Sequence, residues 1–479
     1  MLIGRGICRS TRSATSARSL NVCARSISSK SFTCAWMSIS DLLFCVEILH
    51  TVVYTEPMLD IKFIRENPDI IKEAARKKRV DFNVSKLIDL DKKRRESLTE
   101  VEKLRSLQNK ASDTVAHIDD ETKKKAAIED LREIKEKLTK KETELKKIAP
   151  EWEKLMYDVP NIPDLSVPEG ATDEENTEVR KSTEPKPFDF TPKTHVDLLE
   201  SLNLADLERG TKVSGFRGYF LKNEASLLSL ALWQFTMAHM TKKGYEPIFT
   251  PALVREENLI GTGHFPQARE DVYKLADDNL YLAATAEVPL MGYYRDEILE
   301  ENILPKKFIA FSPCYRREAG SHGKDTKGIY RLHEFFKAEQ LIFAPNNHEQ
   351  SVELHEELTK NAEEVLQTLE LPYRVVTVVA GQLGRAHVKT YDLEVWIPSE
   401  KRYRESHSSS YYHDFQTRRL NIRYRDKNGE TRFCHSLNNT AIATPRILIS
   451  ILENYQQKDG SVRIPSVLQE YIGKDTIRP

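Results

Sequence analysis

The clearest hydrophobic pattern in the chain is a seven-residue repeat between residues 123 and 157. Apolar side chains recur at Leu131, Leu138, Leu145 and Trp152. A companion series three residues later contains Ile134, Lys141, Ile148 and Leu155. Two such positions in every seven, separated by lysine and glutamate, are typical of a helix that packs along one narrow stripe. The pattern predicts a helix from Lys123 to Tyr157, about 50 Å long at 1.5 Å per residue.

A second apolar series precedes this repeat and predicts a partner helix. Its positions are Leu90, Val101, Leu104, Ala111 and Val115. The polar stretch 113–122 separates the two series, so we expect two antiparallel helices joined by a turn. Heptads most often serve dimerising coiled coils. An arm that grasps RNA is the other interpretation, because several lysines along it could meet phosphates: Lys123, Lys124, Lys125, Lys140, Lys141, Lys146 and Lys147.

The remaining pattern divides the chain into further segments. Residues 59–78 predict a short amphipathic helical stretch with a break at Asn67-Pro68. Residues 160–187 are rich in Pro, Asp, Glu and Thr without apolar periodicity, which is typical of a linker. The body after Phe188 mixes helical stretches such as 225–242 with β-rich runs such as 307–311 and 373–379. We therefore expect an α+β fold built on an antiparallel sheet. The predicted boundaries are 1–57 (extension), 58–160 (helical arm), 161–187 (linker) and 188–479 (catalytic body).

The first forty residues have the composition of an organellar import sequence. They contain six basic residues, many serines and no acidic residue. A disordered basic tail or a wrongly assigned gene start is the alternative, and Met58 could be a second start. The apolar stretch 39–54 is interrupted by Asp41, Glu47 and His50, so it falls short of a membrane span of about 20 residues. We expect a location in the mitochondrial matrix, or in the cytoplasm if the extension is no transit peptide, and no membrane partner.

Size, charge and cysteine content narrow the classes of protein. The 479 residues exceed what one hydrophobic core usually serves. The 72 basic and 73 acidic residues leave a net charge of −1, so a nucleic-acid surface must be a local patch. Four of the six cysteines lie in the extension, which leaves Cys314 and Cys434 for the body. This distribution argues against a disulfide framework and against a cysteine zinc site.

The run from Ser312 to Glu339 (SPCYRREAGSHGKDTKGIYRLHEFFKAE) carries the most chemistry. It predicts a strand, a flexible loop with Gly320, Gly323 and Gly328, and a returning strand. Arg316 lies at the end of the first strand, where a guanidinium can hold an ATP α-phosphate and an amino-acid carboxylate in line. The ordered set resembles motif 2 of the class II aminoacyl-tRNA synthetases. The resemblance implies ATP as substrate, Arg316 as a catalytic residue, and ATP contacts from Arg316, Arg317, Glu318 and Phe335, of which Phe335 stacks on adenine.

Two further runs are similar to the other motifs of this class. Residues 435–454 (HSLNNTAIATPRILISILEN) resemble motif 3, whose arginine, Arg446 here, reaches the γ-phosphate and is catalytic. A structural arginine on a core helix is the alternative, although such a residue needs an anionic partner. Residues 244–251 (GYEPIFTP) are a weaker match to motif 1, with Pro251 at a subunit interface. The resemblance implies a homodimer.

Other residues indicate which amino acid the protein would activate. Thr285-Ala286-Glu287 resembles the Thr-x-Glu signature of the seryl-tRNA synthetases, in which threonine and carboxylate receive the substrate ammonium. Glu339 can accept from the amino and hydroxyl groups of serine together. Thr440, with Asn438 beside it, stands where the family contacts the serine side chain. Such a polar pocket rejects alanine because the groups of the site would go unpaired.

The run Glu405-Ser406-His407-Ser408 completes the resemblance, which covers residues 58–479 and includes the arm. In the family pattern these residues contact ATP, and Glu405 and Ser408 bind Mg²⁺ through oxygen ligands. A strand-end ion pair is the alternative for Glu405. The chain departs from the family where Asn439 and Ala441 replace glycines, where His407 lies beside Ser408, and where Thr440 replaces serine.

The resemblance implies a serine–tRNA ligase. Its expected reaction is the activation of L-serine by ATP and transfer of the seryl group to the 3′ end of tRNA(Ser). The helical arm precedes a catalytic body, and this position favours the interpretation that the arm binds RNA. Such an arm would recognise the tRNA by its shape. A non-catalytic paralogue that binds RNA or a protein partner is one alternative. A synthetase of related fold that activates threonine is another.

Overall fold

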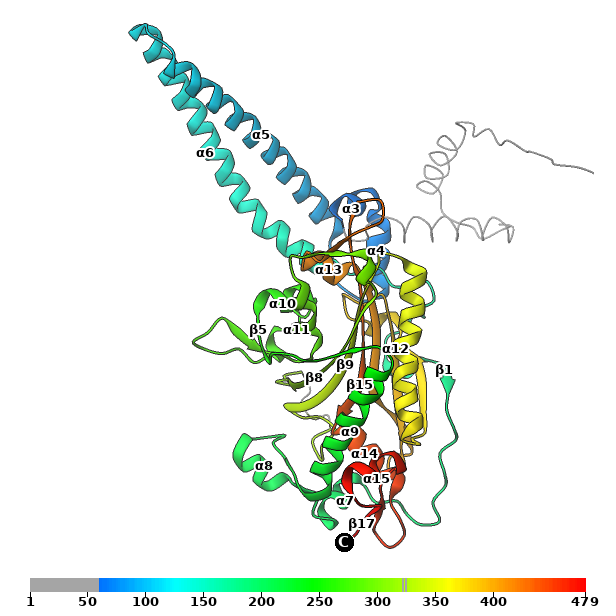
Figure 1. The fold of residues 1–479 in the computed structure, drawn as a ribbon. Helices are drawn as coiled ribbons and strands as arrows, with labels where there is room; N and C mark the ends of the chain where they lie inside the picture. Colours follow the sequence, from blue (N-terminus) through cyan, green and yellow to red (C-terminus); the bar gives the residue numbers. More distant parts are fainter. Residues whose placement is uncertain (1–59, 321–322, 324) are drawn as a thin grey trace, which may run out of the picture. The chain divides into compact units, whose positions relative to one another are not determined.

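The computed structural model describes residues 60–320, 323 and 325–479. The predictions for residues 1–57 lie outside the described residues. Within the described part of the chain, no helix combines the length and the apolar character needed to cross a membrane. These residues form an N-terminal helical hairpin and an α+β body (Figure 1).

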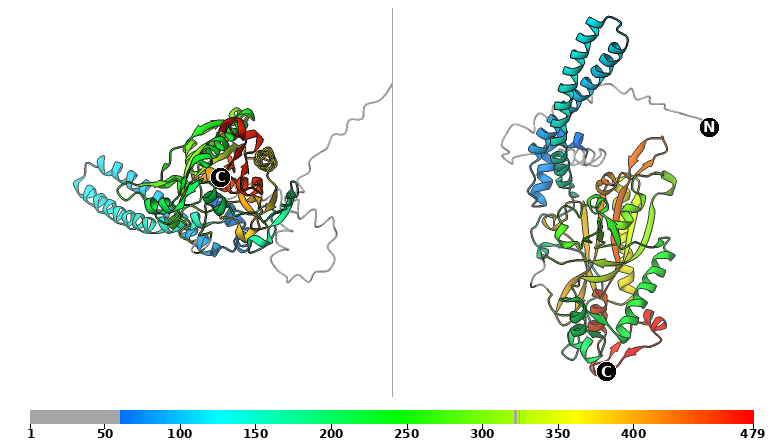
Figure 2. Two further views of the ribbon diagram at one scale, coloured as in Figure 1. Left: turned by 90° about the horizontal axis from the view of Figure 1, so that it is seen from below. Right: turned by 90° about the vertical axis from the view of Figure 1, so that its left-hand side faces the viewer.

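The N-terminal region consists of the four helices α3 (Ile61–Glu66), α4 (Pro68–Lys77), α5 (Val84–Ala116) and α6 (Glu121–Asp158). Helices α5 and α6 lie side by side (Figures 1 and 2). The Asn83 side chain caps α5 by accepting from the Lys86 N–H, and the Asp120 side chain caps α6 by accepting from the N–H groups of Thr122 and Lys123. These caps confine the turn to residues 117–120, which is shorter than the polar stretch 113–122.

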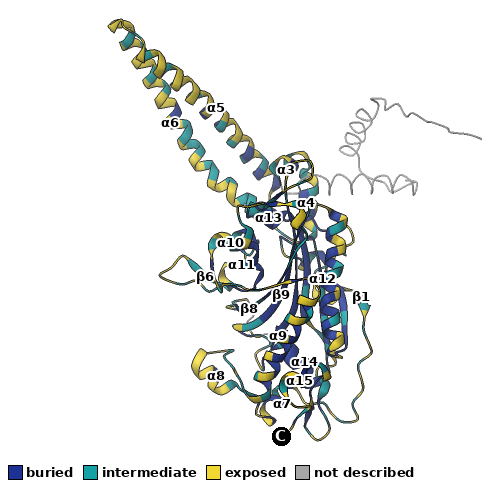
Figure 3. Ribbon diagram, viewed as in Figure 1, coloured by how far each residue is buried: buried dark blue, intermediate teal, exposed yellow. Residues whose placement is uncertain are grey.

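The hairpin buries only a narrow stripe. Val101 on α5 and Leu138 on α6 are buried, while most of both helices is exposed (Figure 3). Across the stripe, the guanidinium of Arg94 lies 4.2 Å from the ring centroid of Trp152. The two-in-seven apolar pattern of the sequence therefore corresponds to a two-helix seam, and the lysine and glutamate positions face solvent.

The body is built on an eight-stranded sheet in the order β1-β10-β11-β12-β15-β9-β8-β4. Its strands are β1 (Thr177–Lys181), β4 (Glu246–Phe249), β8 (Lys306–Tyr315), β9 (Glu334–Ala344), β10 (Tyr373–Thr377), β11 (Lys389–Ile397), β12 (Arg402–His413) and β15 (His435–Thr444). Every neighbouring pair is antiparallel except β4 and β8. The predicted α+β class with an antiparallel sheet is thereby confirmed.

Helices cover one face of this sheet. They are α9 (Asn223–Lys242), α12 (His348–Thr368) and α14 (Arg446–Tyr455), with the shorter α7 (His195–Ser201) and α15 (Ser466–Ile472). Their apolar side chains share one core cluster with the inner strands. The other described elements are α8 (Leu207–Ser214), α10 (Glu256–Gly261), α11 (Glu287–Met291), α13 (Phe415–Arg419), β2 (Ala205–Asp206), β3 (Phe220–Leu221), β5 (Leu253–Arg255), β6 (Leu280–Leu282), β7 (Ile298–Glu300), β13 (Arg423–Arg425), β14 (Thr431–Phe433), β16 (Val462–Arg463) and β17 (Thr476–Ile477).

The stretch 161–187 differs from the linker that its composition predicts. Within it, β1 pairs antiparallel with β10 and forms one edge of the main sheet. Four of its five residues are exposed and none is fully buried. An edge strand of this kind needs no alternation of apolar and polar residues, so periodicity could not reveal it.

Candidate active site

A pocket lies on the face of the sheet opposite to α12. Strand β12 shows the two faces, because Ser408 and Ser410 line the pocket while the hydroxyl oxygen of the intervening Ser409 accepts from Thr359 Oγ1 on α12 at 3.0 Å. Strand β9 supplies Phe335, Lys337 and Glu339, which alternate along the strand and therefore share its pocket face.

A β-bulge in β12 brings Glu405 and Ser408 to the same face. The two residues are three positions apart, so in a regular strand they would point to opposite sides. Opposite them on β11, Ser408 pairs with Asp392 and Glu405 pairs with Glu394, which are only two positions apart. Ser406 is the extra residue, and it turns the Glu405 side chain into the pocket.

Two more irregularities shape the same region. Thr440 on β15 stands directly opposite Glu339 on β9, and the next pair is Ile442 with Ala338, which leaves Ala441 as an extra residue. Tyr412 is the extra residue between β12 and β15. The pocket thus lies where three neighbouring strand pairings lose their regular register.

One end of the pocket contains buried carboxylates. Lys337 Nζ lies 2.5 Å from Glu339 Oε2 and donates to Thr285 Oγ1 at 2.8 Å. Thr440 Oγ1 donates to the same Glu339 oxygen at 3.4 Å, and Gln416 Nε2 donates to Glu287 Oε1 at 2.6 Å. Two carboxylates against one lysine leave room for one further cation, such as a substrate ammonium.

The protonation of this end follows from its burial. Glu287 is 8 % exposed and Glu339 is 2 % exposed. Burial raises the pKa of Glu287, and hydrogen bonding from Gln416 offsets part of the effect. Burial also raises the pKa of Glu339, which the charge of Lys337 only partly opposes. A bound ammonium would stabilise both carboxylates in their charged form.

The other end of the pocket gathers groups suited to a nucleotide. Arg316 follows directly after β8, and its guanidinium lies 5.1 Å from the ring centroid of Phe335. Glu318 accepts from Arg331 Nη1 at 2.7 Å. Its φ of 55° is unusual for a residue other than glycine and marks a constrained backbone at this site.

Arg446 is the first residue of α14 and faces this end. Its Nη1 donates to Glu405 Oε1 at 3.1 Å, which supplies the anionic partner that a buried arginine needs. Tyr330 lies between two guanidiniums, with ring-centroid distances of 3.9 Å to Arg404 and 4.6 Å to Arg446. Burial acts to raise the pKa of Glu405, but the guanidiniums of Arg446, Arg316 and Arg331 together outweigh it, and the pKa is lowered.

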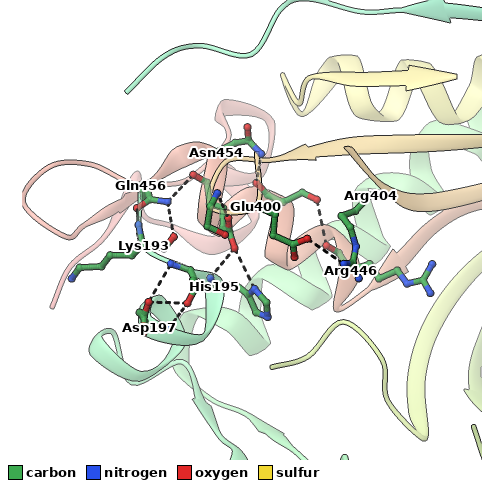
Figure 4. Close-up of polar contacts among 12 residues, drawn as sticks. Lys193, His195, Asp197, Glu400, Arg404, Arg446, Asn454 and Gln456 are labelled. Atoms are coloured by element: carbon green, nitrogen blue, oxygen red, sulfur yellow. Dashed lines mark hydrogen bonds and ion pairs between the residues drawn. The ribbon is translucent and has the colours of Figure 1, made fainter. Parts of the chain in front are cut away.

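The far end of α14 is held by a separate set of contacts (Figure 4). Gln456 exchanges two hydrogen bonds with the backbone of Lys193, at 2.7 and 3.1 Å. Asn454 Nδ2 donates to the Trp396 oxygen at 2.9 Å. Because both ends of this short helix are fastened, the position of Arg446 is fixed by the fold before any ligand binds.

Glu405 and Ser408 present oxygen ligands on one face, which fits a hard cation such as Mg²⁺. Among residues 60–320, 323 and 325–479, no three His, Cys, Asp or Glu side chains form a group that could hold a metal ion. A cation here would therefore need further oxygens from its ligand, as is usual for Mg²⁺ bound with nucleotide phosphates.

The pocket brings together most of the predicted site residues. They are Thr285, Glu287, Arg316, Glu318, Phe335, Glu339, Glu405, Ser406, Ser408, Asn438, Thr440 and Arg446. Three others lie outside its lining. Ala286 is fully buried in a neighbouring apolar cluster, and the side chain of Arg317 is exposed. His407 points away, with its ring nitrogens 2.7 Å from Ser406 Oγ and 3.2 Å from the Ala441 oxygen.

Eleven lining residues are absent from the sequence-based set, among them His264, Tyr330, Lys337, His387 and Tyr412. A period of two would have found Lys337, because it lies between Phe335 and Glu339 on the same face of β9. The two histidines come from loops, and Tyr412 faces the pocket at an irregular position of β12, so periodicity gave no signal for these residues.

Comparison with protein families agrees with this geometry in two separate regions. Residues 58–163 match the seryl-tRNA synthetase N-terminal domain, and residues 273–455 match the class II tRNA synthetase core domain (G, H, P, S and T). The serine–tRNA ligase of Deinococcus radiodurans is 44 % identical over 422 residues, which are 87 % of this chain and 98 % of that protein. The serine–tRNA ligase of Thermodesulfovibrio yellowstonii is also 44 % identical, over 88 % of this chain and all of that protein.

Solved structures extend the agreement to three dimensions. A seryl-tRNA synthetase from Pyrococcus horikoshii complexed with ATP superposes with a TM-score of 0.81 at 39 % identity, covering 88 % of this chain and 99 % of that one. A cytoplasmic serine–tRNA ligase from Naegleria fowleri in complex with AMP gives 0.76 at 34 % identity, covering 86 % and 96 %. With the helical arm, the antiparallel sheet and the pocket all accounted for, the chain belongs to the seryl-tRNA synthetase family of class II.

Proposed function

We propose that the chain activates L-serine with ATP and transfers the seryl group to the 3′ end of tRNA(Ser). As a family member it is an aminoacyl-tRNA ligase that uses ATP. The observation that carries the choice of serine is the buried group of Thr285, Glu287, Lys337, Glu339 and Thr440, at the end of a pocket whose other end suits a nucleotide.

Activation in this pocket rests on holding two anions together. The carboxylate of serine attacks the α-phosphorus of ATP, the bond to the pyrophosphate breaks, and seryl-adenylate forms. Arg316 and Arg446 both line the pocket, where Arg316 would hold the two reacting anions and Arg446 would meet the γ-phosphate. Positioning and charge stabilisation supply the rate enhancement, and no side chain needs to act as a general base.

Mg²⁺ is the proposed companion of ATP, held by Glu405 and Ser408. When bound, it neutralises phosphate charge. Glu405 pairs with Arg446 in the structure described here. Engaging the metal and the γ-phosphate would give both side chains new partners of the opposite charge, so neither would be left as an unpaired buried ion.

Selectivity for serine follows from the polar groups at the carboxylate end. Glu287 and Thr285 receive the ammonium, and Glu339 with Thr440 receives the hydroxyl. Alanine would leave Glu339 and Thr440 without a partner, which is costly in a buried site. Threonine carries an extra methyl group and is opposed by size, which discriminates less strongly.

The hairpin of α5 and α6 is the proposed binding surface for tRNA(Ser). Its exposed lysines supply phosphate contacts in a chain whose net charge gives no general attraction. A rigid two-helix arm suits recognition by the shape of the RNA. The family match over residues 58–163 supports this assignment.

A homodimer and a mitochondrial location are further parts of the proposal. Large apolar side chains are exposed along α8, α9 and the strands around them: Val213, Phe216, Phe220, Leu227, Leu230, Phe249 and Leu253. Phe249, at the end of β4, is 79 % exposed, and a contiguous apolar surface is typical of an interface between subunits. The basic, serine-rich composition of the first forty residues supports import into mitochondria.

Serine-dependent exchange of pyrophosphate into ATP tests the proposed reaction. The purified chain is expected to catalyse exchange with serine, and neither alanine nor threonine should replace it. Exchange with threonine alone would change the specificity and keep the chemistry. The absence of exchange with all twenty amino acids would favour the non-catalytic paralogue, whose remaining activity would be RNA or partner binding.

A further inference from the structure

One loop of the body, residues 384–387, receives the ends of the N-terminal helices. Lys78 caps the C-terminal end of α4, and its side chain enters the body, where only 3 % of the residue is exposed. Its Nζ donates to the backbone oxygens of Gly384 at 3.0 Å, Arg385 at 3.0 Å and His387 at 2.6 Å. The three N–H bonds of an ammonium group are thus matched by three carbonyls.

Two other contacts tie the same loop to the base of the arm. Arg385 Nη1 donates to the side chain and the backbone oxygen of Asp158, the last residue of α6, at 2.8 and 3.1 Å. Asn161 follows α6, and its Nδ2 donates to the oxygens of Ala386 and Tyr412, both at 2.8 Å. Both helical ends of the N-terminal region therefore converge on four consecutive residues.

The Lys78 contact is energetically demanding. Burial lowers the pKa of Lys78 well below its ordinary value. Within the described part of the chain, no carboxylate forms an ion pair with it, so the loop carbonyls are its polar partners. A buried charge held only by backbone dipoles requires those carbonyls to stay in place, because their movement would leave it unpaired.

The loop continues into the serine end of the pocket. His387 Nε2 lies 3.3 Å from Tyr412 Oη, and the two rings are 4.8 Å apart. Tyr412 Oη donates to Asn438 Oδ1 at 3.1 Å. Asn438 lines the pocket together with Glu287. A continuous set of contacts thus runs from Lys78 through the loop and His387 to Tyr412 and Asn438, which line the pocket.

We propose that Lys78 is a positioning residue for serine binding. By fixing the loop 384–387 it holds His387 against Tyr412 and, through the Tyr412 hydroxyl, Asn438, so that these lining residues keep the shape of the pocket in which serine would bind. The nucleotide end is not part of this set of contacts, since Arg316, Phe335 and Arg446 are carried by other elements. The inference rests on the proposed function, because it takes the carboxylate end of the pocket to be the site of serine.

The test is the variant Lys78→Met in the full-length chain, with Lys77→Met as the matched control. Lys77 is the preceding residue, and its Nζ lies 3.8 Å from Glu169 on the surface. In pyrophosphate exchange, Lys78→Met is expected to raise the KM for serine about tenfold and to leave the KM for ATP within twofold. Lys77→Met should change neither value. Calorimetric titration with serine should show the same loss of affinity.

An equal rise in both KM values, or an unchanged KM for serine, would overturn the inference and leave Lys78 as a structural joint. If Lys78→Met does not fold, Tyr412→Phe provides the second test, because it removes one hydroxyl from the middle of the set. It is expected to raise the KM for serine severalfold, and an unchanged value would overturn the proposal. A total lack of serine exchange in the unsubstituted chain would instead overturn the proposed function.

Discussion

The arm and the pocket both use many charged residues, but they place them in opposite environments. On the arm, Arg105 and Glu142 form a 2.7 Å ion pair between α5 and α6, with 61 % and 34 % of the side chains exposed. In the pocket, Lys337 and Glu339 form a 2.5 Å pair with 8 % and 3 % exposed. The two distances are similar, and the surroundings differ.

Stability and activity depend more on the buried ion pairs than on the exposed ones. An exposed pair contributes at most about 1 kcal/mol, because water solvates each partner when the other is removed. Removing one partner of a buried pair leaves an uncompensated charge and costs about 3–5 kcal/mol. We therefore expect substitutions on the arm to act gradually through the tRNA step. Substitutions in the pocket should abolish a step outright.

The largest effect is expected from Arg316→Ala. Loss of the guanidinium leaves the α-phosphate and the serine carboxylate without their shared cation, so the kcat of serine-dependent exchange should fall about a thousandfold. The matched control is Arg432→Ala, because the Arg432 side chain is 47 % exposed and pairs with Asp426 and Glu430 outside the pocket. The control should keep its rate within about twofold. A comparable loss in both variants would remove the contrast between buried and exposed charge.

A smaller effect, confined to the transfer of the seryl group to tRNA, is expected when Lys123, Lys124 and Lys125 on the arm are replaced by alanine. Exchange should remain unchanged. The association constant for tRNA(Ser) should fall. The slope of the logarithm of this constant against the logarithm of the salt concentration should become smaller in magnitude by about 3 if each lysine meets one phosphate. Removing Lys193, Lys458 and Lys474 from the body is the charge-matched control. An identical salt slope for the arm variant and the unsubstituted chain would place the tRNA elsewhere.

The smallest effect concerns a buried group behind the sheet. Burial lowers the pKa of His355 from its ordinary value of 6.5 to about 4. Between these values the unfolded chain binds a proton that the folded chain does not, so stability falls as the pH falls through this window. His355 should thus cost the folded state about 2 kcal/mol at pH 5 relative to pH 7.5.

The variant His355→Gln isolates this contribution. Glutamine does not titrate in this range, so the gap in the free energy of unfolding between the two chains should shrink by that amount from pH 7.5 to pH 5. Urea unfolding at a series of pH values measures it. A gap that stays constant with pH would mean that His355 titrates alike in the folded and unfolded chains, and a gap that widens toward pH 5 would mean that His355 is charged in the folded state.

The arm and the chemical motifs were within reach of sequence reasoning. The heptads report a repeating environment, and both capping residues, Asn83 and Asp120, stand in the sequence at the helix starts. The ordered sequence runs that contain Arg316 and Arg446 identify these two arginines as class II residues. Their convergence on one pocket then follows from the antiparallel sheet, which places β9, β12 and β15 side by side.

The parts that escaped prediction depend on strand register and on distant loops. The sequence groups His407 with the ATP contacts because it lies between two of them, yet it directly precedes Ser408 on β12, so strand alternation turns its ring to the face opposite the pocket. His387 lies in the loop 384–387, whose backbone oxygens accept from Lys78, some three hundred residues away in sequence. Edge strand β1 carried no periodicity because it buries almost nothing.

The extra residue Ser406 also sets how the family can tolerate change in chain length. Deleting one residue there would let β12 run regularly beside β11, and the sheet itself would lose little. The chain would then read Glu405-His407-Ser408, so Glu405 and Ser408 would stand two positions apart and still share the pocket face. Straightening the bulge at the present chain length would instead move Glu405 to the face opposite Ser408, and a comparison of relatives that scores only which residues match would overlook the difference.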